Sequence, residues 1–469
     1  MYSEVEGIKE RCSPRSQSFA DEVVRRQHQQ LEIRWDFDMS VHWYDEMASA
    51  ETDLFTAPIT QHNVEGGQWV TYSPVAPLGE SSVIEFKIAS KGDYYIDLYH
   101  SYVHVQGKIT LANGADLPDN APVGPVNLTL HSLFTQVDCA LNDVVVTPSH
   151  QTYPYRAYLE TLLSYGEDAK KSQLTMGMWH KDTAGKMDAV NDDNEGLQTR
   201  RALTTNSKKI DMLGKLHLDL HFQERFILNK VRINYKLTRA KDAFVLMGAN
   251  PGYKFQMTTC DMYLRRVKLS DTQMLEHTRG LLKTPAVYPI RRVVVKTFTV
   301  PRGEMSTSNE DLFLSEVPKR VIVGMVDNDV FHGNFKKSPF HFKHYSLDFA
   351  ALFLDGQQIP SQALQPNFAE GTYVRCYQTL FGAVGKFGQD EGNAVTMKEY
   401  PQGYTLLCFD LTPDLEDDGH FNPIKEGNIR LELQFAAGLP NTINVIVLAE
   451  FENVIQISQD RKVAKNFTE

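Results

Sequence analysis

The sequence predicts a mostly β protein built from two similar β-sandwich modules. Its 469 residues include 25 Phe, 20 Tyr and 21 Pro among many Val and Thr, a composition typical of strands and turns. Hydrophobic residues make up 42% and charged residues 23% of the chain, as in a globular protein. The length is too great for one ordinary core and suits two domains of about 200 residues each plus an extension.

An internal repeat is the second observation behind this prediction. The first copy contains, in order, Ala140-Leu141-Asn142-Asp143, Pro148-Ser149, Arg156-Ala157-Tyr158 and Thr161-Leu162. The second copy contains Leu352-Phe353-Leu354-Asp355, Pro360-Ser361, Arg375-Cys376-Tyr377 and Thr379-Leu380. In both copies the Asp stands the same distance before Pro-Ser. Two halves that share one sequence pattern usually fold as two copies of one module.

The first half begins with a polar segment of mixed charge, residues 1 to about 46, in which a helix is expected from Ser18 to Trp35. We expect this segment to be a flexible arm, the alternative being an arm that docks on a neighbouring subunit. Alternating or continuous apolar runs broken by Gly, Pro, Asn and Asp then predict strands. These strands are Gln68–Ser73, Val83–Ile88, Tyr95–Leu111 and Val126–Val146.

A helix is expected at Thr152–Tyr165, because its tyrosines and leucines recur along one face and Gly166 is placed to end it. The polar residues 167–208 that follow, among them the acidic run Asp192–Glu195, show no periodicity. Such a long insertion is expected to be a surface excursion rather than core.

Strands are expected to resume at Leu213–Phe222, Phe226–Leu237 and Met262–Leu269. Ser270 with Gln273 three residues later is typical of a capping box that opens a short helix. This helix and the segment Pro285–Pro289 mark the predicted boundary, which gives an extension at 1–50 and modules at 51–284 and 285–469.

The second half repeats the rhythm, with a helical segment at Thr372–Leu380 in the same relative place as the first. Its expected strands are Ile290–Val300, Arg320–Val326, Tyr345–Leu354, Tyr404–Phe409, Asn428–Phe435 and Ile443–Ile455. Short strands joined by long loops favour sandwiches, of which the jelly roll is one common form.

Charge and cysteine content exclude several classes of function. The formal net charge of -11 argues against wholesale nucleic-acid binding. The five cysteines are far apart, odd in number and without a C-x-x-C pair, which predicts buried thiols of an intracellular protein. No leader and no apolar run near the 18 to 20 residues of a spanning helix is found, so we expect no membrane span and a cytosolic or nuclear protein.

A search for catalytic motifs finds no nucleophile elbow, zinc-protease motif, phosphate loop or dinucleotide fingerprint. His217, Asp219 and His221 would share one face of a strand and could hold a metal, but a half-buried strand explains them better. The other histidine group is His332, His341 and His344, near Asp327 and Asp329. Because His341 and His344 would face opposite sides of a strand, we interpret them as surface groups.

The acidic segments Gln389–Gly392 and Asp414–Asp418 have no calcium-loop spacing and are interpreted as solvated loops. We therefore predict no catalytic, metal-binding or cofactor-binding residue. The sequence indicates that surfaces, rather than a pocket, carry the function.

Several longer phrases of the chain match a known family in order, over roughly Asp53 to Ile457. They are Asp53–Gln61, Tyr153–Tyr158, Ser164–Gly166, Ala169–Leu174, Asp355–Ser361 and Phe409–Leu415. In these phrases the chain resembles the hexon-type major capsid proteins of Maverick (Polinton) elements and adintoviruses.

The resemblance implies an all-β double jelly roll, in which two eight-stranded sandwiches stand side by side with short helices and an N-terminal extension. It also implies a structural protein without catalysis. Three chains would form a homotrimeric, pseudo-hexagonal capsomer that contacts neighbouring capsomers and a penton-type vertex protein in an icosahedral shell around double-stranded DNA. The segment 167–208 would be an outer tower or an inter-subunit clasp. The protein would be made in the host cytoplasm, assemble in the nucleus and reside in the virion capsid, without sequence-specific nucleic-acid binding.

Two alternatives remain at this point. A penton-type minor capsid protein would be expected to carry one jelly roll and fivefold symmetry, which the internal repeat disfavours. A β-sandwich carbohydrate-binding protein or enzyme would be expected to show aromatic-rich binding loops or convergent carboxylates in a cleft.

Overall fold

The computed structural model describes residues 60–79, 82–89, 92–148, 150–191, 193–415 and 420–467. The chain separates after Gln61, and the description below concerns the compact unit His62–Glu469. The helix predicted at Ser18–Trp35 and the predicted arm lie outside the described residues.

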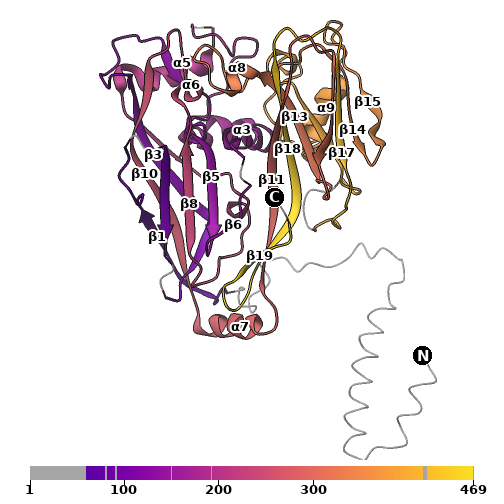
Figure 1. Ribbon diagram of the computed structural model, residues 1–469. Coiled ribbons are helices and arrows are strands. Elements are labelled where there is room, and N and C mark those ends of the chain that lie inside the picture. The colour runs from indigo at the N-terminus through magenta and orange to yellow at the C-terminus, as the bar shows by residue number, and fades with distance from the viewer. Residues whose placement is uncertain are drawn as a thin grey trace, which may run out of the picture. The chain divides into compact units, whose positions relative to one another are not determined.

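The first sandwich consists of two antiparallel four-stranded sheets (Figure 1). One sheet has the spatial order β1 (Val64–Tyr72), β10 (Tyr253–Leu269), β3 (Tyr95–Leu111), β7 (Ile210–Gly214). The other has the order β2 (Val83–Ile88), β8 (Ile233–Arg239), β5 (Phe134–Leu141), β6 (Val144–Val145). A short pair, β4 (Val123–Pro125) with β9 (Leu246–Gly248), is added at one end.

The second sandwich repeats this order strand for strand. One sheet runs β11 (Ala286–Val300), β18 (Ile443–Ile457), β13 (Arg320–Asp327), β16 (Leu406–Asp410), with β19 (Val463–Lys465) added to β18. The other runs β12 (Ser306–Phe313), β17 (Ile429–Phe435), β14 (Leu347–Leu354), β15 (Gln357–Leu364). Each sandwich is thus a jelly roll, and the predicted double jelly roll is confirmed.

The repeated phrase found in the sequence is a tight hairpin followed by a helix. Residues 142–143 join β5 to β6 with φ values of 46° and 69°, and residues 355–356 join β14 to β15 with φ values of 48° and 85°. Two central residues with positive φ form the hairpin turn that suits the strand twist, which explains the Asn, Asp and Gly there. The first hairpin leads to α3 (Tyr153–Ser164) and the second to α9 (Val374–Gly382), close to the predicted helices.

Hydrogen bonds fix the register of the two turns. The amide of Asn142 donates to the carbonyl of Arg232, and the Arg232 amide donates back to Oδ1 of Asn142 at 2.8 Å. Asp355 makes the same exchange with Asn428, whose amide lies 2.9 Å from Oδ1 of Asp355. Asn142 therefore corresponds to Asp355, and the sequence alignment that paired the two aspartates was wrong by one residue.

The remaining helices are short and connect the strands of the two sandwiches. Figure 1 shows α5, α6 and α8 at one end, α7 at the other and α3 between the sandwiches. Their bounds are α2 Thr129–Ser132, α4 Glu167–Lys171, η3 Gln173–Gly177, α5 Glu195–Thr204, η4 Thr205–Ser207, η5 Asp219–His221, α6 Asp242–Val245, α7 Asp271–Leu281, α8 Asn328–Phe331 and η6 Tyr400–Gln402. The predicted cap of α7 is confirmed, because Oγ of Ser270 accepts from the Gln273 amide at 3.3 Å.

Three predicted elements of the first half need correction. The segment Val126–Val146 is not one strand, because Leu128 adopts a φ of 53° and starts the short helix α2. The strand predicted at Leu213–Phe222 ends at Gly214. The strand predicted at Phe226–Leu237 begins only at Ile233. Tertiary contacts, rather than alternation, decide these three boundaries.

The insertion 167–208 is not the surface excursion predicted from its polarity. Trp179 is 1% exposed and Arg200 is fully buried, with Nη2 of Arg200 2.6 Å from Oδ1 of the buried Asp182. The hydroxyl of Tyr404, in the second jelly roll, donates to the Asp182 carbonyl at 2.7 Å. The segment therefore packs against both jelly rolls of the same chain. The segment consists of short helices and loops, so its buried residues do not recur with the period of a long helix or a strand.

The hydrophobic cores of the two jelly rolls interpenetrate. Tyr155, Tyr158 and Leu159 of α3 belong to the cluster that fills the second jelly roll. Conversely, Tyr288 of β11 and Ile455 of β18 belong to the cluster of the first. This explains why His62–Glu469 forms one compact unit. Within the described residues, no helix combines the length and apolar character needed to cross a bilayer.

Candidate functional site at the seam between the jelly rolls

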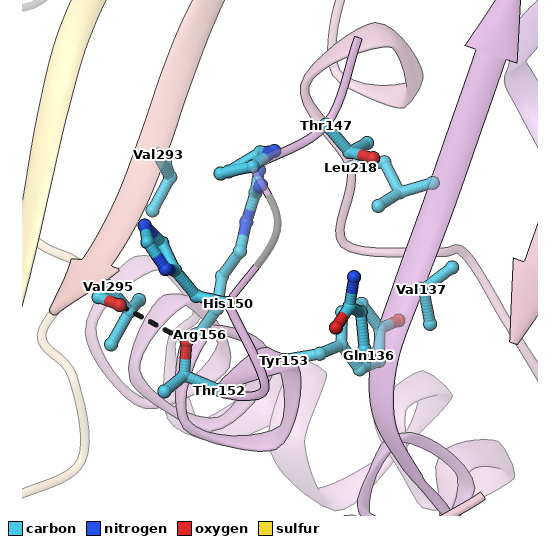
Figure 2. A pocket seen from close by; sticks show the side chains of 11 residues that line it. Gln136, Val137, Thr147, His150, Thr152, Tyr153, Arg156, Leu218, Val293 and Val295 are labelled. Atoms are coloured by element: carbon cyan, nitrogen blue, oxygen red, sulfur yellow. Dashed lines mark hydrogen bonds between the residues drawn. The ribbon is translucent and has the colours of Figure 1, made fainter. Parts of the chain in front are cut away.

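The contact surface between the two jelly rolls, here called the seam, holds a small hollow. Figure 2 shows it between Gln136 and Val137 of β5, the start of α3, and Val293 and Val295 of β11. Its cavity of about 30 Å³ holds about two water molecules, because one buried water needs roughly 10–15 Å³ of such space. This space is too small for an organic substrate.

A buried charge network borders the hollow. Nε of Arg156 donates to Oε1 of Glu160 at 2.8 Å, and its Nη2 lies 2.7 Å from Oδ1 of Asp219. Nδ1 of His217 lies 2.5 Å from Oε2 of Glu160. Helix α3 brings Arg156 and Glu160 together, because they lie one turn apart. The segment around η5 supplies His217 and Asp219.

The network holds its charges by mutual attraction. Burial alone would lower the pKa of Arg156, but Glu160 and Asp219 raise that pKa above its ordinary value. Burial alone would raise the pKa of Glu160, but Arg156 and His217 lower it. For Asp219 burial dominates and raises the pKa in spite of Arg156. Removing one partner would therefore leave an uncompensated buried charge.

The same network fastens the free edge of β11 to the first jelly roll. The amide of Val293 donates to Oδ1 of Asp219 at 3.2 Å. Oγ1 of Thr152 donates to the carbonyl of Val295 at 3.3 Å, as Figure 2 shows. These bonds satisfy backbone groups of an edge strand that would otherwise lack partners. The geometry is that of a structural joint.

Aromatic rings form the upper part of the seam. Tyr158 stacks on Phe340 with ring centroids 4.1 Å apart and planes 3° apart. Tyr155 lies flat against Phe331 and meets Phe340 edge-on. No sequence pattern had indicated a role for Phe340, because its partners Tyr155 and Tyr158 belong to a helix of the other jelly roll, far away in the chain.

A C-terminal strap, residues 458–467, closes the opposite part of the seam. Nε and Nη2 of Arg461 donate to the carbonyl and to Oδ1 of Asn229 at 2.8 and 2.7 Å. The side chain of Asn142 donates to the Arg461 carbonyl at 2.8 Å. The strap thus ties the end of the second jelly roll to a hairpin of the first, and no sequence signal had indicated it.

The three residues His217, Asp219 and His221 do not form a shared ligand set. They lie on a turn rather than a strand, which corrects the predicted alternation, and all three are buried. Nε2 of His221 lies 3.3 Å from the Tyr235 hydroxyl, whereas the other two join the network around Arg156. Among the residues that the structure describes, no group of three or more His, Cys, Asp or Glu side chains could hold a metal ion.

The second histidine group is also dispersed. Nδ1 of His341 lies 2.8 Å from Oδ2 of Asp188, and His344 stacks on Phe368. The strand predicted around His341 and His344 is wrong, because this stretch is a loop in which Phe342 makes one isolated β-bridge.

Asp327 has partners other than these histidines. Its carboxylate accepts from Lys343, Lys337 and Tyr345 at 2.7–2.9 Å. Burial would raise the pKa of Asp327, but these hydrogen bonds lower it to about 2.

The acidic segments lie on the surface where the structure describes them. Asp390 and Glu391 are exposed, and Asp414 lies 2.7 Å from Nε2 of His420. Residues 416–418 fall outside the described part of the chain.

The four described cysteines are expected to resist thiol reagents in the native protein. Cys139, Cys260, Cys376 and Cys408 are buried and unpaired, as predicted, and burial raises the pKa of each thiol to about 12. The thiolate is the reactive form, so labelling should require unfolding. Mass-spectrometric mapping after iodoacetamide treatment checks this, and rapid labelling of any of the four in native protein would contradict it. Cys12 lies outside the described residues.

Acid is expected to destabilise the protein through His221. Burial, aided by Lys215 and Arg156, lowers the pKa of His221 to about 3, below its ordinary value near 6.5. Since the unfolded chain then binds the proton more readily, this stability is present above pH 6.5 and is lost as the pH falls toward 3. Urea unfolding should show the variant His221→Gln losing about 2 kcal/mol less than wild type between pH 7.5 and pH 5. Equal losses in the two proteins would contradict the assignment.

Several solved structures have a similar fold. A chain in a structure of the Sputnik virophage superposes with a TM-score of 0.63 at 12% identity, over 90% of this chain and 92% of that one. The Faustovirus major capsid protein gives a TM-score of 0.55 at 10% identity, over 86% and 92% of the two chains. The chain shares its fold with viral major capsid proteins. The mavirus major capsid protein adds a TM-score of 0.51 at 12% identity, over 91% and 94%.

A sequence relative exists in an animal. An uncharacterized protein of Caenorhabditis elegans is 25% identical over 415 residues, which are 85% of this chain and 97% of the relative. No protein-family model matches the chain.

Proposed function

We propose that the protein is a hexon-type major capsid protein, the structural subunit that tiles an icosahedral shell around double-stranded DNA. The observation that carries the proposal is the pair of jelly rolls of identical strand order, joined by a buried seam into one unit. Known major capsid proteins share this arrangement over nearly their whole length. A rigid pair of similar modules lets three chains present six similar sides.

The proposed partners are two further copies in a homotrimer, neighbouring capsomers and a penton-type vertex protein. We place the jelly rolls at residues 51–284 and 285–469, with the insertion at 167–208. The net charge of -11 supports a shell that does not itself condense DNA or read its sequence.

We assign the protein to Maverick (Polinton) elements or adintoviruses. The phrases quoted above support this, and a relative in a nematode is what a capsid gene carried within animal genomes would give. Synthesis in the cytoplasm, assembly in the nucleus and residence in the virion capsid follow from the assignment.

We propose no catalytic role and no cofactor. The seam hollow admits about two waters, and its charged groups are paired with one another. The penton-type alternative would need a single jelly roll, whereas this chain has two.

Sedimentation velocity on the purified full chain tests the proposal. Three chains of 53.3 kDa should sediment together as a particle of about 160 kDa. A protein that stays monomeric at high concentration would contradict the capsid role. Binding to a glycan array by such a monomer would favour the carbohydrate-binding alternative.

A further inference from the structure

A pocket of about 440 Å³ lies against α7. It is lined by α7, the start of β3, residues 225–228 and the start of β11, and Figure 1 shows α7 at the end of the sandwiches opposite α5 and α6. Its volume is typical of sites for organic ligands, which measure about 300–1,000 Å³. The seam hollow, by contrast, admits only water.

The walls of this pocket are apolar or already hydrogen-bonded. Tyr95, Leu228 and Tyr288 are buried. The hydroxyl of Tyr288 donates to the carbonyl of Phe226 and accepts from the amide of Leu228, both at 3.1 Å. The hydroxyl of Tyr95 pairs with Nδ1 of His277 at 3.1 Å. An occupant therefore needs an apolar body, because both hydroxyls already have partners.

Arg225 supplies a positive charge at the pocket. Its side chain is exposed, and its Nη1 donates to the carbonyl of Val287 at 2.7 Å. It forms no ion pair with any residue that the structure describes. A guanidinium carries several N–H donors in a planar fork that suits carboxylates, so most of them remain for an anionic group. Glu276 of α7 also lines the pocket and does not pair with Arg225, so an anion is expected on the Arg225 side.

Helix α7 lacks a fully covered face. None of its eleven residues is buried, and Leu281, which lines the pocket, is only half-buried. A helix of a globular protein normally buries its apolar face by packing. A molecule that filled the pocket would complete the packing of α7.

Gly280 of α7 leaves this space open. Its backbone is helical rather than left-handed, and a Cβ at this position would meet no atom of the described residues within 4 Å. Glycine destabilises a helix relative to alanine, so neither conformation nor packing within the described part of the chain calls for it here. Because Gly280 lines the pocket, a larger side chain there is expected to occupy it.

We propose that this pocket binds a fatty carboxylate, with its hydrocarbon chain between the apolar walls and its carboxylate at Arg225. The walls exclude a sugar as the occupant, because its hydroxyls would lose hydrogen bonds to water without replacement. The guanidinium favours an acid over an amine of the same chain length. The pocket is formed within one chain, so the inference goes beyond the capsid role and does not depend on the trimer.

Isothermal titration calorimetry of laurate into the purified full chain tests the inference, with laurate kept below the concentration at which it forms micelles. One molecule per chain should bind, with a Kd on the order of 10–100 μM. Because laurate would bind the folded state, it should also raise the melting temperature measured by circular dichroism. Absence of binding to wild type would overturn the inference.

A blocking variant and a matched control locate the site. Gly280→Leu should fill the pocket and weaken laurate binding at least about ten-fold. Thr278→Leu places the same side chain at an exposed position of α7 outside the pocket lining, about 200° around the helix from residue 280, and should bind like wild type. Both variants introduce a stronger helix former, so both should stay folded. Equal affinities of Gly280→Leu and wild type would overturn the site.

Charge variants test the orientation of the ligand. Arg225→Gln should weaken laurate binding about ten-fold, because it removes the cation. Glu276→Gln should strengthen binding about two-fold, because it removes a like charge. Dodecylamine, which has the same chain and a cationic head, should bind wild type more weakly than laurate does. Tighter binding of dodecylamine, or an unchanged affinity in Arg225→Gln, would overturn the placement of the carboxylate.

Discussion

Replacing Arg156 by methionine is expected to lower the free energy of unfolding by about 3–5 kcal/mol. The side chain is 7% exposed and neutralises Glu160 and Asp219 at 2.8 and 2.7 Å. Methionine fills similar space but removes the cation that the two buried carboxylates share, which leaves Asp219 without its ion-pair partner and Glu160 with His217 alone. Urea unfolding followed by tryptophan fluorescence measures the loss, at one fixed protein concentration because self-association adds to apparent stability.

An exposed ion pair supplies the control for this variant. Nζ of Lys268 lies 2.7 Å from Glu65, with the two side chains 49% and 43% exposed. Lys268→Met should therefore change the free energy of unfolding by less than about 1 kcal/mol. The double variant Arg156→Met/Asp219→Asn should regain part of the loss, since it removes one uncompensated charge. A loss below about 1 kcal/mol for Arg156→Met would contradict the role given to the network.

Replacing Phe340 by alanine is expected to cost about 3–5 kcal/mol. The ring is 1% exposed, stacks on Tyr158 and meets Tyr155 and Phe244 edge-on. Its removal opens a cavity at the seam, where the structure can collapse only by shifting one jelly roll on the other. Chemical unfolding measures the effect, under the same conditions as for Arg156.

Leu314→Ala is the control for Phe340, because Leu314 is 57% exposed and its truncation should cost less than about 0.5 kcal/mol. Two separate unfolding transitions in Phe340→Ala would indicate that the jelly rolls had become independent, which is consistent with the seam. Stability equal to that of the control would contradict it.

The sequence predicted the fold best where the side chains of a strand alternate between core and solvent. The predicted bounds of β2 and β3 match the structure, because their side chains alternate between core and solvent. The strands β12 and β15 were not predicted. Both are edge strands, with the polar sequences STSNEDLF and QQIPSQAL, and their strand character comes from pairing with β17 and β14.

The seam was only partly accessible to sequence reasoning. Arg156 and Glu160 stand four residues apart on a predicted helix, which is a recognisable pair. Their partners His217 and Asp219 were noticed as a possible metal site, because alternation suggested a strand. Only the fold brings the two pairs together, and it converts an apparent ligand set into a charge network.

The most direct test of the account is negative-stain electron microscopy of the purified protein. A capsid subunit with two jelly rolls predicts particles with threefold symmetry and a pseudo-hexagonal outline, in which six similar densities surround the axis. Fivefold particles, or single two-lobed molecules without further association, would contradict it.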